Sequence, residues 1–200
     1  MKENTMTQLS PSPTAAVQPS KAASVARWMV SFVGFPLGGL IALIVSGPVD
    51  SVPSAVAGGL LTGAVLGAFQ AWAMRSERRL AWILATAIGL ATGLAFGSAT
   101  VDFGTDLGDL VLQGAITGLA VGLAQAAVLL RRTGPIALIW PVYVTGVWAL
   151  GWAISTSIGI QVEDQFTVFG AAGAITVALL TSVLPVLLHT RFATTEKSHS

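Results

Sequence analysis

The chain of 200 residues contains no cysteine and few charged residues, which restricts the chemistry available to it. Without cysteine it has no disulfide, no thiolate metal site and no disulfide exchange. Only 10% of its residues are charged, whereas a soluble domain carries about 25%. Its net charge of +1 gives no indication of nucleic-acid binding.

Catalytic motifs are missing as well. The sequence has no G-x-x-x-x-G-K-[ST] and no H-E-x-x-H motif, and its two histidines, His189 and His199, lie at the C-terminal end. No ionisable side chain falls in the central part of a long apolar stretch, where proton relays and ion pathways have theirs. We therefore expect no enzymatic activity, no catalytic residue, no cofactor and no resident metal.

Long apolar runs make up most of the chain, and 54% of its residues are hydrophobic. A membrane-spanning helix needs about 20 mostly apolar residues, and backbone groups in lipid must be hydrogen-bonded within the helix or within a closed barrel. Barrel strands would appear as short alternating runs, which are not seen. The sequence predicts an all-α integral membrane protein with six transmembrane helices, at about 27–46, 53–74, 80–100, 108–130, 136–159 and 167–189.

The two ends of the chain differ from this six-helix membrane domain, 27–189. Residues 1–26 are rich in Ser, Thr, Pro and Ala and predict a disordered tail. They do not resemble a cleaved signal peptide, because the apolar run starts too late. Residues 190–200 form a second short polar tail.

Charge is distributed unequally between the two sides of the predicted helices. All ten Lys and Arg residues fall on one side, which includes the loop with Arg75, Arg78 and Arg79 and the loop with Arg131 and Arg132. Six of the nine acids fall on the other side. Four tryptophans are predicted at the basic ends of helices, at headgroup level: Trp28, Trp72, Trp82 and Trp140. The positive-inside rule then places both termini in the cytoplasm, and the Ala-, Gly-, Val- and Arg-rich composition is typical of a bacterial cytoplasmic membrane protein.

An internal repeat accompanies this pattern. Thr62-Gly63, Gly67 and Gln70-Ala71 recur 55 residues later, as Thr117-Gly118, Gly122 and Gln125-Ala126. The segment 173–176 repeats 114–117 letter for letter but lacks the later glycine and glutamine. We interpret this as three tandem two-helix hairpins, 27–74, 80–130 and 136–189, around a pseudo-threefold axis.

Nine glycines form three stripes with a spacing of four residues: Gly59, Gly63 and Gly67; Gly89, Gly93 and Gly97; Gly114, Gly118 and Gly122. Residues four apart share one helix face, and small residues allow another helix to approach closely in lipid. The stripes predict packing inside the bundle, with docking of a partner helix as the alternative.

Gln70 and Gln125 continue two of these stripes and should face the interior. A buried amide in a membrane needs a hydrogen-bonding partner on another helix. The alternative is that the two amides line a solute site near the cytoplasmic half. Three prolines, Pro36, Pro141 and Pro185, are expected to kink their helices.

Asp102, Asp106 and Asp109 cluster on the acidic side. Carboxylates are possible ligands of Ca²⁺ or Mg²⁺. We favour solvated loop residues that stabilise a helix N-terminus through the helix dipole, and the role of the cluster stays open.

The G-x-x-x-G-x-x-Q repeat, followed by Arg and by Trp at the next helix, resembles small bacterial multi-span proteins of unknown function over residues 60–160. This resemblance implies no activity. In size the chain is similar to the substrate-binding membrane subunits of energy-coupling-factor vitamin transporters, although it has Gly34-x-x-x-Gly38 where those subunits typically have Ala-x-x-x-Ala.

The expected function is that of a non-enzymatic structural protein or complex subunit in the lipid bilayer. It would pack through its glycine stripes against a partner membrane protein or a second copy of itself. The alternative is a small-solute binding or transport protein, or a channel, with a site near the bundle interior.

Overall fold

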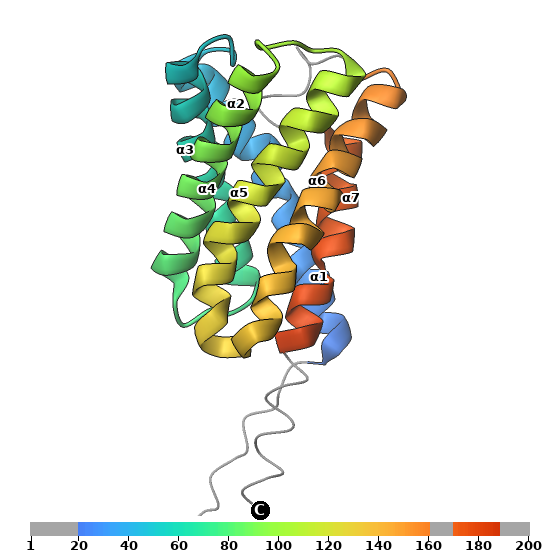
Figure 1. The fold of residues 1–200 in the computed structure, drawn as a ribbon. Coiled ribbons are helices and arrows are strands. Elements are labelled where there is room, and N and C mark those ends of the chain that lie inside the picture. The colour runs from blue at the N-terminus through green and yellow to red at the C-terminus, as the bar shows by residue number, and fades with distance from the viewer. Residues whose placement is uncertain (1–19, 161–169, 189–200) are drawn as a thin grey trace, which may run out of the picture.

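A computed structural model describes residues 20–160 and 170–188, and every regular element in this part of the chain is a helix (Figure 1). The helices are α1 (Lys21–Val30), η1 (Ser31–Val33), α2 (Gly34–Ser46), α3 (Val52–Ala73), α4 (Arg79–Thr100), α5 (Leu107–Thr133), η2 (Gly134–Ile139), α6 (Trp140–Ser157) and α7 (Ala171–Thr181). Residues 183–188 continue in helical conformation after a turn at Ser182.

Five helical segments in this part of the chain are long and apolar enough to cross a membrane: Lys21–Ser46, Val52–Ala73, Arg79–Thr100, Leu107–Ser157 and Ala171–Leu188. This is the all-helical architecture of a membrane-embedded protein. The sequence predicted six spans. The difference arises because η2 joins α5 and α6 into one continuous segment of 51 residues.

The N-terminal boundary was predicted too late. The first helix begins at Lys21, not at residue 27, because the Ser20 hydroxyl accepts a hydrogen bond from the Ala23 N–H at 3.2 Å and caps it. The remainder of the predicted N-terminal tail, 1–19, lies outside the described residues, as do 161–169 and 189–200. The start of the last predicted span and the C-terminal tail therefore lie there too.

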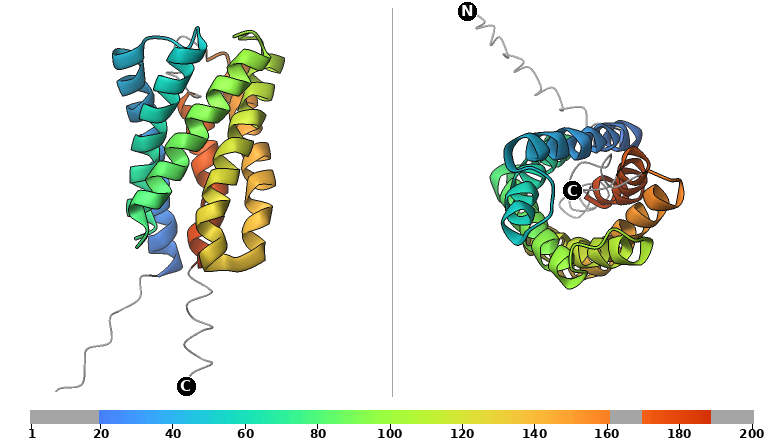
Figure 2. Two further views of the ribbon diagram at one scale, coloured as in Figure 1. Left: turned by 60° about the vertical axis from the view of Figure 1, so that its left-hand side comes forward. Right: turned by 90° about the horizontal axis from the view of Figure 1, so that it is seen from above.

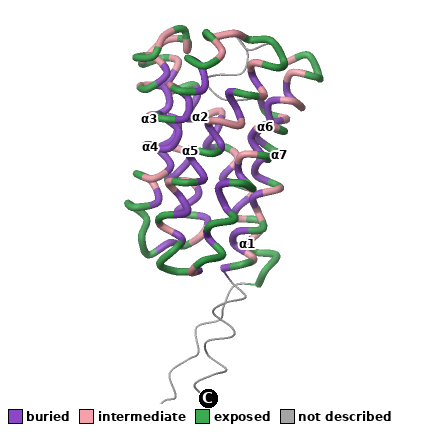
Figure 3. The backbone as a smooth tube through the Cα atoms, in the orientation of Figure 1, coloured by how far each residue is buried: buried purple, intermediate pink, exposed green. Residues whose placement is uncertain are grey.

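The helices form a ring in which each packs mainly against the next one in the chain, from α2 to α7 (Figure 2). We call this arrangement the helix ring. The side chains that fill it are aromatic and aliphatic, and buried positions recur along the inner face of each helix (Figure 3). Phe35 on α2 contacts Trp148 on α6 edge-to-face, with ring centroids 5.9 Å apart, so the interior is packed between non-consecutive helices.

The prolines lie at helix starts rather than in helix interiors. Pro36 is in the first turn of α2 directly after η1, and Pro141 is the second residue of α6 directly after η2. Proline is tolerated in a first turn, where its missing N–H has no intrahelical partner, and a 3₁₀ segment precedes each of these two helices. Pro185 follows the turn that ends α7, and nearby the Tyr143 hydroxyl donates to the Leu180 carbonyl at 2.8 Å. The predicted kinks at the three prolines stay a prediction.

The ring closes between the first and last helices. The Trp28 indole N–H donates to the Thr181 hydroxyl oxygen at 3.1 Å, and that hydroxyl donates to the Val177 carbonyl at 2.6 Å. Both side chains are buried. This single hydrogen bond joins residues 153 positions apart in the sequence.

We expect Trp28→Phe and Thr181→Val to be coupled in a double-mutant cycle of unfolding free energy. Interhelical hydrogen bonds in membranes contribute about 0.6–2 kcal/mol, and the coupling term should fall in this range. Denaturant titration of the four proteins in detergent measures it. Strictly additive effects of the two substitutions would show that the bond does not stabilise the closed ring.

Candidate functional site

The two glutamines singled out from the sequence meet in one buried polar network. Gln70 on α3 accepts a hydrogen bond from Gln125 Nε2 on α5 at 3.3 Å and from the Trp82 indole N–H on α4 at 3.1 Å. Gln125 Nε2 also donates to the Thr86 hydroxyl at 3.1 Å, and its Oε1 accepts from the Trp140 indole N–H at 2.8 Å. The network therefore joins α3, α4, α5 and α6 without a formal charge.

Both glutamine oxygens are occupied by these contacts, and both side chains are buried. The Thr86 hydroxyl donates to the Trp82 carbonyl at 2.9 Å and keeps a lone pair for Gln125. Such bonds between helices act as polar links in an apolar environment. The arrangement engages both amide oxygens within the protein.

Three of the four tryptophans predicted at the basic ends of helices are buried between helices. Trp28, Trp82 and Trp140 are 1%, 1% and 7% exposed, and only Trp72 is exposed, at 52%. Each of these three buried indoles donates its N–H to an uncharged side chain on another helix, so none of the three N–H groups is left without an acceptor. Sequence reasoning missed this because the acceptors are 12 to 153 residues away.

Each glycine stripe lies against the next helix of the same chain. A Cβ added at Gly59 on α3 would come 2.5 Å from the Ala91 Cα on α4, and one added at Gly93 on α4 would come 2.6 Å from the Thr117 Cα on α5. The stripe on α5 meets α6 in the same way. The other close approaches are those of Gly63 to Ala87, Gly67 to Ile83, Gly89 to Val121, Gly97 to Gln113, Gly114 to Trp152, Gly118 to Val144 and Gly122 to Pro141.

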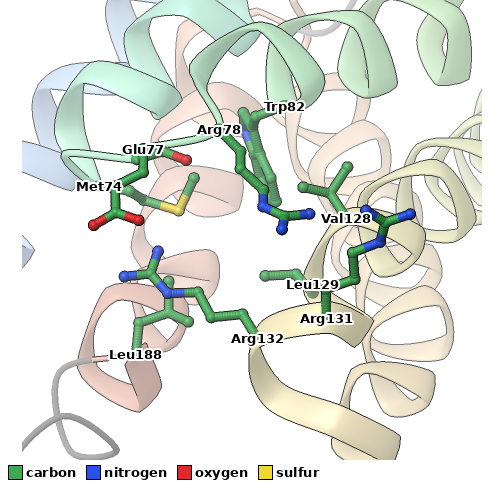
Figure 4. Close-up of a pocket in the computed structure, with 10 residues that line it drawn as sticks. Met74, Glu77, Arg78, Trp82, Val128, Leu129, Arg131, Arg132 and Leu188 are labelled. Carbon is green, nitrogen blue, oxygen red and sulfur yellow. The ribbon is translucent and has the colours of Figure 1, made fainter.

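A cavity of about 280 Å³ opens at the end of the ring where the arginines gather, which we call the arginine end. Its lining includes Arg78, Arg131, Arg132, Glu77 and Trp82, and we call it the arginine cavity. Arg78 comes from the start of α4 and Arg132 from the end of α5, and their side chains extend toward it from opposite sides (Figure 4). In the sequence these arginines indicate only the topology, and no local pattern predicts that they line one space.

A tight turn between α3 and α4 places part of the lining. Arg75 has a φ of 51°, in the left-handed region, and the Ser76 N–H donates to the Ala71 carbonyl at 3.0 Å. This closes α3 and turns the chain back across the end of the ring. Ser76 and Glu77, directly after the turn, then line the cavity.

Trp82 connects the cavity to the polar network. Its side chain lines the cavity, while its N–H donates to Gln70. Guanidinium groups bind carboxylate and phosphate oxygens through paired, charge-assisted hydrogen bonds. With three arginines and one glutamate in the lining, the cavity suits an anion.

The acidic cluster lies at the opposite end of the ring. Asp106 is the N-cap residue of α5 and Asp109 lies in its first turn, where a carboxylate interacts favourably with the helix dipole. Asp102 has a φ of 50° in the preceding turn. Within residues 20–160 and 170–188, no group of three or more His, Cys, Asp or Glu side chains is arranged to hold a metal ion.

The resemblance to small bacterial multi-span proteins stays a prediction. No protein-family model matches the chain, no curated protein matches it, and no solved structure matches it.

Proposed function

We propose that this chain is a non-enzymatic membrane protein with six spans, and that its arginine cavity binds a small anionic group at the cytoplasmic surface. The cavity is the observation that carries the proposal. Three arginines, one from the α3–α4 connection and two from the end of α5, line one space, and among the described residues of this lining Glu77 alone carries a carboxylate. A cavity lined by more positive than negative side chains attracts anions.

The lengths of α5 and α6 support six spans rather than five. At about 1.5 Å per residue, the 27 residues of α5 extend about 40 Å and the 18 residues of α6 about 27 Å, close to or above the roughly 30 Å of hydrocarbon. The two helices lie side by side in opposite directions, since Gly114 faces Trp152 and Gly122 faces Pro141. Each is therefore suited to one crossing.

Charge supports the orientation. The connection between α3 and α4 and the end of α5, which carry these arginines, lie at the same end of the ring as the start of α1 and the described end of the last helix (Figure 1). We assign this end to the cytoplasm of a bacterial cell by the positive-inside rule, with both termini inside.

The proposed threefold repeat draws support from side-chain contacts. Gln70 and Gln125, 55 residues apart, are bonded to each other, and Trp28, Trp82 and Trp140 each donate to a neighbouring helix. The third copy fits less well, because Thr176 is only half-buried whereas the letter-matched Thr117 is buried.

The function of a complex subunit, with a partner protein or a second copy docked on the glycine stripes, stays a prediction. The stripes offer it no free surface, because each of them lies against a helix of the same chain. Any such partner would have to use other faces of the ring. A solute bound between Gln70 and Gln125 is likewise less favoured than one in the arginine cavity, because both amide oxygens are already hydrogen-bonded.

Inorganic phosphate should bind saturably to the protein in zwitterionic nanodiscs, with a change in tryptophan fluorescence because Trp82 lines the cavity. Arg78→Gln should weaken binding by about tenfold or more, since a hydrogen bond to a charged group contributes about 1.5–3 kcal/mol. Arg79→Gln is the matched control, because Arg79 is the next residue and does not line the cavity. The proposal fails if phosphate gives no saturable signal, or if both substitutions have equal effects.

A further inference from the structure

A second cavity, adjoining the first, has the opposite character. It is a groove of about 210 Å³ on the side of the ring, between η2 and α6 on one wall and the helical residues 183–188 on the other. Its walls include Ile136, Ile139, Val183 and Leu187, and we call it the lateral groove. These four side chains are 38–64% exposed, so the groove opens on the outer face of the bundle.

The arginine cavity and the lateral groove share a wall. Leu129 lines both of them. At the end of α5, Arg132 lines the cavity and the next residue, Thr133, lines the groove; near the end of the last helix, Leu188 lines the cavity and Leu187 lines the groove. The positively charged arginine cavity and the apolar lateral groove are thus separated by a single layer of side chains.

We infer that the two cavities together bind one anionic phospholipid, with its headgroup phosphate among the arginines and an acyl chain in the lateral groove. This inference rests on the proposed function and names the ligand class. Basic pockets between helices at the cytoplasmic surface bind anionic lipid headgroups. Trp140 and Tyr143 line the groove, as amphipathic aromatic side chains do near the level where headgroup meets hydrocarbon.

The position of the groove favours a lipid chain, because the groove is apolar and its exposed walls lie on the outer face of the bundle, where a bilayer supplies acyl chains. A soluble anion would use the arginine cavity and leave the exposed apolar groove without a role. A phospholipid uses both, with the charges at the surface and the hydrocarbon toward the bilayer.

The test uses the full-length protein in phosphatidylcholine vesicles that contain a small fraction of lipid with brominated acyl chains, which quench tryptophan fluorescence on contact. Trp140 lines the groove, so quenching of its fluorescence reports an acyl chain bound there. Brominated phosphatidylglycerol should quench at a several-fold lower fraction than brominated phosphatidylcholine. A Trp72→Phe background removes the most exposed of the six indoles.

Two pairs of variants separate the contribution of the lipid headgroup to binding from that of the acyl chain. Arg78→Gln should reduce the preference for phosphatidylglycerol by about fivefold, the contribution of one basic residue near a membrane surface, while Arg79→Gln leaves it unchanged. Ile136→Gln should abolish the preference but keep the affinity for inorganic phosphate. Leu138→Gln, also in η2 and exposed but outside the groove, should behave as wild type. Leu187→Gln tests the opposite wall in the same way.

Equal quenching by the two brominated lipids would overturn the inference. Identical behaviour of Ile136→Gln and Leu138→Gln would also overturn it. If inorganic phosphate still binds and Arg78→Gln still weakens it, the proposed anion site stands while the lipid is excluded. If phosphate binding is absent as well, both proposals fall together.

Discussion

Replacement of Gln125 by leucine is expected to destabilise the helix ring by about 2–4 kcal/mol, because it removes three interhelical hydrogen bonds of about 0.6–1.7 kcal/mol each. It also leaves the Trp140 N–H buried without its acceptor, which adds a desolvation cost. Thermal or denaturant unfolding in mild detergent measures the loss. The double variant with Gln70→Leu should lose less than the sum of the single variants, since the two amides share one bond.

Gln113→Leu is the matched control for this prediction. Gln113 lies on the same helix and is also buried, but its side chain forms no hydrogen bond with a described residue. The same chemical change should therefore cost much less there. Equal destabilisation by the two substitutions would mean that glutamine burial, rather than the network, accounts for the effect.

Gly59→Ala is expected to destabilise the ring by about 1–3 kcal/mol or more, which is typical when extra volume is forced into a close-packed site. The new methyl group would lie 2.5 Å from the Ala91 Cα, and because that atom is backbone, α3 and α4 must separate. In lipid the separation of two helices lowers the stability directly, because van der Waals contact between helices holds the bundle together. The unfolding free energy of Gly59→Ala, compared with that of the control variant below, measures the effect.

Gly146→Ala offers the control on α6. Gly146 is helical and exposed, and a Cβ there meets nothing within 4 Å. Alanine favours a helix over glycine by about 0.8–1 kcal/mol, so this variant should be unchanged or more stable. If Gly59→Ala is as stable as Gly146→Ala, the close approach of α3 and α4 does not limit packing.

The neutral glutamine network and the arginine cavity lie at different depths in the bundle. Gln70, Gln125 and Thr86 satisfy one another deeper in the bundle, where a charge would be costly in lipid. The arginines are held at the end, where headgroups and water can reach them. Trp82 belongs to both the network and the lining of the cavity, so a change in the network is expected to alter the cavity as well.

Several features follow from the sequence alone, and for a local reason. Apolar runs longer than a bilayer requires predict helices, and glycines four residues apart must share one helix face wherever that helix lies. The start of α1 was in principle readable too, because Ser20 precedes a run of helix-forming residues. These properties depend on neighbours within a few residues in the chain.

Other features depend on the tertiary structure, because they join residues that no local pattern connects. Trp28 is buried where the first and last helices meet, and its N–H has an acceptor there because Thr181, 153 residues away, lies beside it. Gln70 and Gln125 bond to each other only because α3 and α5 both pack on α4 at matching heights. Arg78 and Arg132 face one cavity because the tight turn after α3 and the end of α5 lie at the same end of the ring. Periodicity determines which face of a helix is apolar, but the choice of neighbour and the relative height of two helices arise from side-chain packing over the whole bundle.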